Sequence, residues 1–289
     1  MDTAWQRFLM ADRRNGVICT TDADTLVDPD WVFFTLEAVR QGARAVGGRI
    51  LVPHAADGHG RAYRKQHLQD VTYRSLQYCL ESMIDPVAGD PWPRHFQHFG
   101  PSTAVRADVY RACGGIPPLR SLEDVGLALA LERIDVPITH DPRVRVTTSS
   151  RISDRVGGKC FSEQLDAWAA LEERRESQRV IGLDNCKRLF KWKVALRRAY
   201  ERRRVGQCPR LRAMAEQLGL HAAHLELRMA TSPTFGQLYQ WCRVQLENDA
   251  EFADEPIAKA IRELRQFTHS FRHRAAGTLP AGSVPAALG

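Results

Sequence analysis

The chain has 289 residues, of which 44% are hydrophobic and 26% are charged, the balance of an ordinary globular protein. No apolar run approaches the roughly 20 residues of a membrane-spanning helix, and the segment MDTAWQRFLMADRR does not contain the apolar stretch of a signal peptide. We therefore expect a cytoplasmic location. The seven cysteines show no CxxC spacing, which favours reduced thiols over a disulfide framework.

Hydrophobic periodicity predicts alternating helices and strands in the first part of the chain. Residues 1–12 favour a helix, and residues 17–21 a short buried strand that ends at Asp22. A helix is expected to begin at Asp28-Pro29, because proline suits a first helical turn. A strand over 45–52 and a long, mostly polar helix over 62–84 follow.

The pattern continues through a loop at 85–99, a helix that resumes near Ser102, a helix over 120–131 and a strand over 136–148. From Ser162 onward, apolar residues at spacings of three and four predict only helices. We therefore predict an α/β, Rossmann-like domain over 1–160, an all-helical extension over 161–275 and a disordered tail over 276–289.

Two carboxylates, Asp22 and Asp24, follow the buried strand 17–21 directly. Carboxylates one residue apart converge on a small volume, and hard cations such as Mg²⁺ or Mn²⁺ prefer such oxygens and commonly share them with substrate phosphates. The alternative is a surface turn in which aspartate caps the helix that begins at Asp28-Pro29.

Further motifs follow in a fixed order. Pro29-Asp30-Trp31 comes after the Asp22-Ala23-Asp24 motif, and three later motifs follow it: Gly100 to Arg106, Gly114-Gly115-Ile116 and Glu123-Asp124. Over roughly residues 1–160 this order resembles the family-2 glycosyltransferases of the GT-A fold. The resemblance implies a partial GT-A domain that transfers a sugar from a UDP- or GDP-linked donor to a hydroxyl acceptor, with inversion.

The resemblance also implies roles for single residues. Asp22 would contact the donor ribose or the metal ion, and Asp24 would ligate Mn²⁺ or Mg²⁺. Asp124, with Glu123 beside it, would be the general base that deprotonates the acceptor hydroxyl, a role worth roughly 10²–10⁴-fold in rate. Helix N-capping is the plainer explanation for this acidic pair, and both can hold together.

Other residues extend this predicted site. By the resemblance, His140 would complete the metal shell, although a single histidine is more often a hydrogen-bonded structural residue. Gly100 and Arg106 would contribute to the donor site. Arg151 and Arg155 would cover the diphosphate, which arginine binds through its planar fork, unless they are solvated loop charges. The segment His95 to Phe99 could line a pocket or form a buried plug.

The chain departs from the family in one respect. The family places a nucleotide-binding half ahead of the Asp-x-Asp strand, and here only 21 residues precede Asp22. We therefore expect most of that half to be lacking, which would leave a sheet edge and an apolar face uncovered. Activity of this chain is then open, and a non-catalytic homologue that acts as an interaction module is the alternative.

A third class also places Asp-x-Asp at a strand end. In phosphatases of the haloacid dehalogenase type, Asp22 would be a covalent nucleophile. That class also requires a Gly-Asp-x-x-x-Asp motif, which the sequence does not contain.

The segment Lys187 to Arg204 holds nine basic residues and one acid. It is amphipathic, and a charge run on a helix is usually a solvated face. The alternative is a peripheral contact with an anionic membrane through 187–204. No nucleic-acid motif accompanies the charge, so we expect no nucleic-acid partner.

Overall fold

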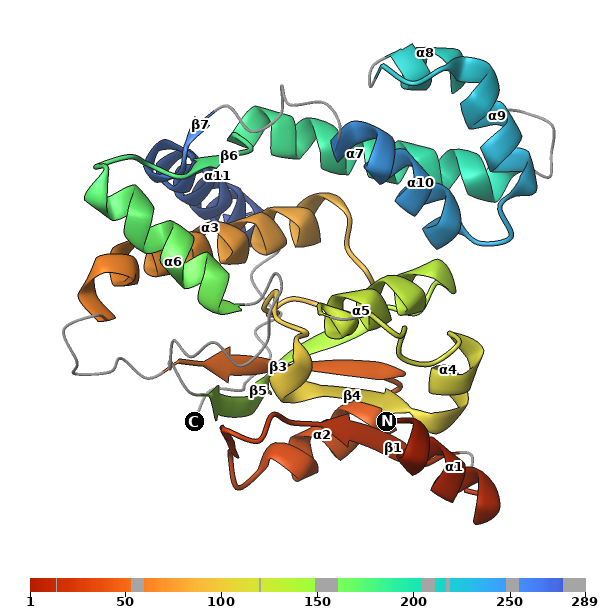
Figure 1. Ribbon diagram of the computed structural model, residues 1–289. Coiled ribbons are helices and arrows are strands. Elements are labelled where there is room, and N and C mark those ends of the chain that lie inside the picture. The colour runs from red at the N-terminus through yellow and green to blue at the C-terminus, as the bar shows by residue number, and fades with distance from the viewer. Residues whose placement is uncertain are drawn as a thin grey trace.

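The computed structural model describes residues 1–13, 15–52, 60–119, 121–148, 161–203, 211–216, 219–247 and 255–277. It has the predicted α/β architecture with a helical C-terminal part: a mixed sheet with its covering helices lies below a separate layer of helices (Figure 1). Within these ranges, no helix combines the length and the apolar character needed to cross a bilayer.

The sheet has five strands in the order β1-β4-β3-β5-β2. The strands are β1 (Val17–Thr20), β2 (Thr25–Val27), β3 (Ala45–Leu51), β4 (Thr103–Arg106) and β5 (Ile138–Thr148). Strand β3 is parallel to β5, and the pairs β1–β4, β3–β4 and β2–β5 are antiparallel. Strands β1, β3 and β5 therefore point the same way, and β4 begins at the edge where these three strands end.

The helix predicted near Ser102 is wrong, because Thr103–Arg106 is instead a central strand of the sheet, between β1 and β3. A 3₁₀ turn, η1 (Gly100–Ser102), leads into β4, and the helix α4 (Ala107–Ala112) follows it. Four residues are too short for any periodicity to show, and only the pairing with neighbouring strands makes this segment extended. The three-residue strand β2 was missed for the same reason.

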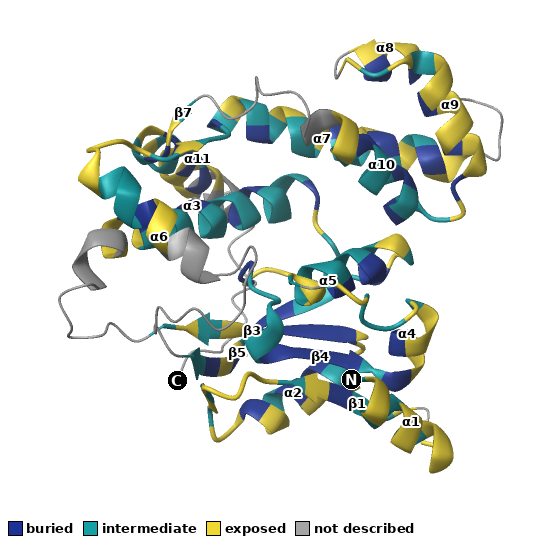
Figure 2. Ribbon diagram, in the orientation of Figure 1, coloured by how far each residue is buried: buried dark blue, intermediate teal, exposed yellow. Residues whose placement is uncertain are grey.

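Both faces of the sheet are covered by helices, as the alternation of side chains along a strand requires. On one face, Val46 and Ala104 pack against Trp31 and Ala38 of α2 (Trp31–Arg40). On the other face, the neighbouring residues Ala45 and Val105 pack against α4, α5 (Glu123–Arg133) and α1 (Asp2–Met10). The central parts of β3 and β4 are accordingly dark blue in Figure 2, and the outer faces of these helices are largely yellow.

The long helix α3 (Gly60–Ile84) belongs to the helical layer, although it precedes the boundary predicted at residue 160. Its Tyr73 and Leu80 share a core with Cys186 of α7 (Leu183–Arg202) and with Ile257 and Leu264 of α11 (Ile257–Gly277). Helix α6 (Phe161–Glu173) packs on α3 as well. Two short strands, β6 (Arg179–Val180) and β7 (Glu255–Pro256), pair inside this layer, where only helices were expected.

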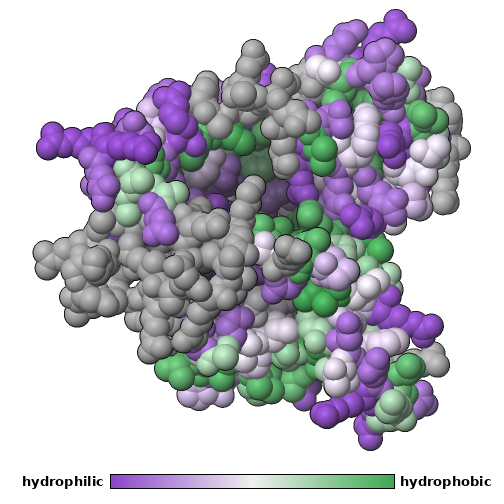
Figure 3. All heavy atoms as spheres, viewed as in Figure 1, coloured by the Kyte–Doolittle hydropathy of each residue, from purple (hydrophilic) through white to green (hydrophobic). Residues whose placement is uncertain are grey.

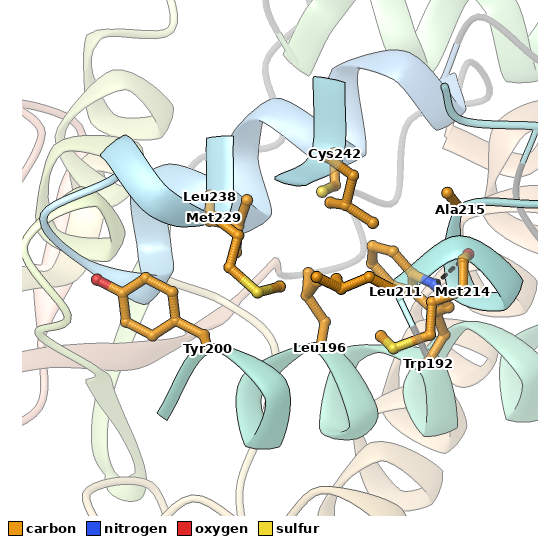
Figure 4. Packing of buried hydrophobic residues seen from close by; sticks show 10 residues of the cluster. Trp192, Leu196, Tyr200, Leu211, Met214, Ala215, Met229, Leu238 and Cys242 are labelled. Carbon is orange, nitrogen blue, oxygen red and sulfur yellow. Dashed lines mark hydrogen bonds between the residues drawn. The ribbon is translucent and has the colours of Figure 1, made fainter. Parts of the chain in front are cut away.

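The remaining helices form a subdomain against α7. They are α8 (Leu211–Glu216), α9 (Ala222–Thr231) and α10 (Phe235–Glu247). Trp192, Leu196 and Tyr200 on one face of α7 meet Met229 and Leu238 (Figure 4). The tail predicted to be disordered lies outside the described residues from 278 onward.

Charged side chains join α3 to α7 in the interior. Lys193 of α7 lies 2.8 Å from Glu81 and 3.7 Å from Asp85, and Arg197 binds Asp85 through both of its terminal nitrogens. Asp85 is 3% exposed, so these are desolvated ion pairs. The attraction of Glu81 and Asp85 outweighs burial and raises the pKa of Lys193.

The basic segment 187–204 is therefore only partly a solvated face. Lys193 and Arg197 point inward, whereas Lys191, Arg198 and Arg202 are exposed on the outer side of α7. Any membrane contact through this helix would depend on the outer residues alone, and it stays a prediction.

Replacing Asp85 with alanine should lower the free energy of unfolding by about 3 kcal/mol, because Arg197 loses its carboxylate partner and Lys193 keeps only Glu81. The measurement is equilibrium unfolding in urea. The matched control is Asp70→Ala within α3, where the ion pair of Asp70 with Arg74 is partly exposed. This control should lose less than about 1 kcal/mol. Equal losses would mean that the α3–α7 pairs contribute no more than surface pairs.

Candidate functional site

Asp22 and Asp24 lie at the edge of the sheet where β1 ends. The chain leaves β1 at Thr20 and crosses to β2, which begins at Thr25 on the opposite border of the sheet. The amide of Thr25 donates to the carbonyl of Asp22 (3.1 Å) and closes the turn. Open α/β sheets bind ligands at the carboxyl ends of their strands, and both aspartates lie at this end of β1.

Gly100 lies between Asp22 and Asp124. Its amide donates a hydrogen bond of 2.8 Å to Oδ2 of Asp124. A Cβ atom at this position would lie 3.3 Å from Oδ1 of Asp22 and 3.7 Å from Oδ2 of Asp124. Three residues that are far apart in the sequence therefore meet at one place.

Helix α5 presents Glu123 and Asp124 in its first turn. Leu122 adopts a left-handed conformation (φ 60°), and the chain turns sharply into the helix there. Oδ1 of Asp124 accepts a hydrogen bond from the amide of Val125 (2.7 Å). The positive end of the helix dipole favours carboxylates at this place, so capping and a functional role coexist.

Four carboxylates influence one another here. Desolvation raises the pKa of Asp22 above its ordinary value of 3.8, and the negative charges of Asp24, Asp124 and Glu123 raise it further. Asp22 as a whole residue is exposed, and its Oδ1 is the carboxylate oxygen that faces Gly100. Like charges held together are unfavourable unless a cation joins them.

The carboxylates fit part of a metal site. In the described portion of the chain, no three His, Cys, Asp or Glu side chains converge in a way that could hold a metal ion. Mg²⁺ bound with nucleotides typically takes one or two protein carboxylates and completes its shell with phosphate oxygens and water. Asp22 and Asp24 fit that pattern in the type of donor and in position.

Arg106 lies away from this cluster. It pairs with Val17 at the start of β1, whereas Thr20 at the end of β1 pairs with Thr103. Three residues of strand correspond to about 10 Å. Its guanidinium also binds both oxygens of Asp108 (3.0 and 2.7 Å), so the structure does not bring Arg106 to the predicted donor site.

His140 has partners for both of its ring nitrogens. Nδ1 lies 2.8 Å from Oδ2 of Asp90, and Nε2 lies 3.2 Å from Nδ1 of His98. Burial alone would raise the pKa of Asp90, but the hydrogen bonds and charge of His140, with the charge of Arg94, hold it below its ordinary value. A metal-ligand role stays a prediction, and it would require His140 to give up the bond to His98.

The segment His95 to Phe99 forms an interior plug, which was one of its two predicted roles. His95 and Phe96 are each 8% exposed. Desolvation, with the charge of His140, lowers the pKa of His95 to about 3 and that of His98 to about 4. No local pattern in the sequence indicates the bonds among Asp90, His98 and His140, because His140 lies 42 positions from His98 and 50 positions from Asp90. Arg151 and Arg155 lie outside the described residues.

Replacing Asp22 with asparagine tests the repulsion among the carboxylates. Because the pKa of Asp22 is raised by folding, its contribution to stability is fully present at pH values below 3.8, the ordinary pKa of the side chain. That contribution is lost as the pH rises through the folded-state pKa, where the carboxylate becomes charged. At neutral pH, without divalent cations, Asp22→Asn should raise the free energy of unfolding, by less than about 1 kcal/mol because the site is open to water. The gain should vanish as the pH falls below 3.8, and urea unfolding across this range measures it.

Asp28→Asn is the matched control. The Asp28 carboxylate lies 3.4 Å from a guanidinium nitrogen of Arg145, so the same substitution should leave stability unchanged or lower it. A loss of stability in Asp22→Asn at neutral pH would contradict the repulsion.

In comparisons with known proteins, no protein-family model, curated protein or solved structure matches the chain.

Proposed function

We propose that this chain transfers a sugar from a nucleotide-diphospho-sugar to a hydroxyl acceptor, with a divalent cation held at Asp22 and Asp24. The observation that carries the proposal is the position of Gly100 between Asp22 and Asp124, at the carboxyl edge of the sheet. This arrangement joins three of the five motifs on which the family resemblance rests: the Asp22-Ala23-Asp24 motif, the Gly100 turn and the Glu123-Asp124 pair.

The cation would supply positive charge to the diphosphate leaving group. The chain's own contribution begins with carboxylates that are already close together and uncompensated. The charges that shift the pKa of Asp22 are those of the carboxylates of Asp24, Asp124 and Glu123. A bound cation would relieve their repulsion, so cation binding is favoured before any donor contact forms.

Asp124 would accept the proton of the acceptor hydroxyl. Two backbone amides, those of Gly100 and Val125, fix the orientation of its carboxylate. Each carboxylate oxygen still has a lone pair for a further donor. A base held in a fixed direction loses little entropy when the acceptor arrives. Glu123 adds negative charge beside it.

A cytoplasmic location stays part of this proposal. It is supported by the thiols, since the five cysteines in the described ranges are free. The phosphatase alternative gains no support, because the sequence does not contain the Gly-Asp-x-x-x-Asp motif that this class requires.

One observation favours a second candidate, a non-catalytic interaction module. Large apolar side chains are exposed on β2 and α2: Leu26, Val27, Val32, Phe33 and Leu36. Figure 3 shows apolar atoms gathered at the bottom of the molecule, where Figure 1 places α2. An apolar patch of this kind is typical of a protein–protein interface.

Calorimetric titration with UDP and GDP, with and without Mn²⁺, separates the two candidates. A transferase should bind either UDP or GDP, and it should do so only in the presence of Mn²⁺. The substitution Asp24→Asn removes a metal ligand and should weaken nucleotide binding at least about 10-fold. Asp28→Asn, near the site but paired with Arg145, should bind normally. A folded chain that binds neither nucleotide would contradict the transferase and favour the interaction module.

Asp124→Asn tests the base. The amide keeps the size of the side chain and can still accept from Gly100, so nucleotide binding should persist. Once a donor is identified, the rate of transfer should fall by roughly 10²–10⁴-fold. Joint loss of binding and transfer would instead mean that Asp124 is a ligand of the cation.

A further inference from the structure

A groove lies between α3 and α11 in the helical layer, on elements that do not carry the acidic cluster. Its volume is about 760 Å³, and it is open to solvent. Helix α3 contributes residues 64–72 and helix α11 contributes residues 258–265. The helices are held together by the core that contains Tyr73, Leu80 and Leu264, so the groove has rigid walls.

The rim of the groove is cationic. Arg64 and Lys65 come from α3, and Arg262 and Arg265 come from α11; all four are exposed. Lys65 lies 3.1 Å from Glu172, while within the described residues no ion pair or hydrogen bond joins the three arginines to another side chain. Among the described residues no acid lines the groove, and the nearby Glu263 and Asp70 pair with Lys259 and Arg74 instead.

The floor of the groove is apolar. Leu68 of α3 is 46% exposed, and Ala258 and Ile261 of α11 line the opposite side of the groove. These residues follow the helical spacing that places Arg64 with Leu68 and Ala258 with Arg262, four positions apart on one face. Each wall therefore carries cations next to apolar surface, and the pattern repeats on both helices.

The dimensions select the kind of occupant. Volumes of about 300–1,000 Å³ are typical of sites for small ligands and cofactors. The α3 wall from Arg64 to Thr72 is about 12 Å long, roughly two helical turns, which is short for a bound peptide helix. Arginine forks match the oxygens of a phosphate, and an apolar floor suits hydrocarbon.

We propose that this groove binds the phosphate headgroup of an anionic membrane lipid, with Arg262 and Arg265 on the phosphate and Leu68 against the first methylenes of the chains. The proposal does not depend on glycosyl transfer. It places the lipid contact on α3 and α11, whereas the sequence offered a membrane contact through segment 187–204 only as an alternative to a solvated face.

The test is co-sedimentation of the full chain with phosphatidylcholine vesicles, with and without phosphatidic acid. The chain should bind only the anionic vesicles, and Arg262→Gln/Arg265→Gln should weaken binding about 30-fold, from roughly a fivefold effect for each cation near the surface. Arg198→Gln/Arg202→Gln removes the same charge from exposed positions on α7 and should change binding at most a few-fold. All four positions are exposed, and thermal unfolding checks that both variants fold.

Leu68→Ser keeps the charge and tests the floor. It should weaken vesicle binding but leave the affinity for glycerol 3-phosphate, the headgroup without chains, unchanged. Equal losses in the two arginine variants would overturn the proposal, because charge alone would then explain binding. Absence of binding to anionic vesicles would overturn it as well, and so would equal affinity for glycerol 3-phosphate and the lipid. Binding of an acidic peptide in preference to the vesicles would assign the groove to a protein partner instead.

Discussion

The candidate site depends on two positions of β3 that have no side chain. A Cβ atom at Gly48 would lie 2.0 Å from Oγ of Ser102, and one at Gly47 would lie 2.7 Å from the carbonyl oxygen of Gln97. The segment 97–102 therefore lies directly on the strand. The side-chain amide of Gln97 pairs with the backbone of Ile50, and the indole of Trp31 donates to Ser102 (2.9 Å). These contacts fix the turn whose Gly100 amide binds Asp124, so a larger residue at position 48 would displace the turn and separate the carboxylates.

The chain treats its acids in two opposite ways. Asp85 and Asp90 are buried and Glu81 is partly buried, and each of these carboxylates pairs with a cation, namely Arg197, Arg94 and Lys193 respectively. Asp22 is more accessible, and the charges that shift its pKa are all of its own sign. Burial disfavours the charged form of the interior carboxylates more strongly than that of Asp22, and the paired cations offset this cost. Among the described residues, the carboxylates at the sheet edge therefore differ from those of the interior in having no compensating cation among the charges that shift the pKa of Asp22.

The sequence predicts what local patterns determine. The strand before Asp22, the helix that begins near Glu123 and the helical C-terminal part all carry their own periodicity or capping signal, and the structure has them. Strand β4 carries none, because it becomes extended only through its pairing with β1 and β3. The bonds of His140 to Asp90 and His98 are equally non-local, and a lone histidine in a strand has no feature that reveals them. Arg106 was misplaced because spacing along the chain does not show which end of an antiparallel pair a residue occupies.

The helical layer also bears on the geometry of the sheet edge, through both ends of α5. Asp124 lies in the first turn of this helix, and Asp135 follows its last turn. The carboxylate of Asp135 accepts hydrogen bonds from the first amides of α10, at Phe235 (3.1 Å) and Gly236 (2.7 Å). A side chain at position 236 would meet the carbonyl oxygen of Glu132, so glycine permits this close approach. Gln240 adds bonds to Leu129 and Glu132. Because a helix is stiff over eleven residues, holding its far end limits how Asp124 can move, and the extension thereby supports a carboxylate that it does not touch.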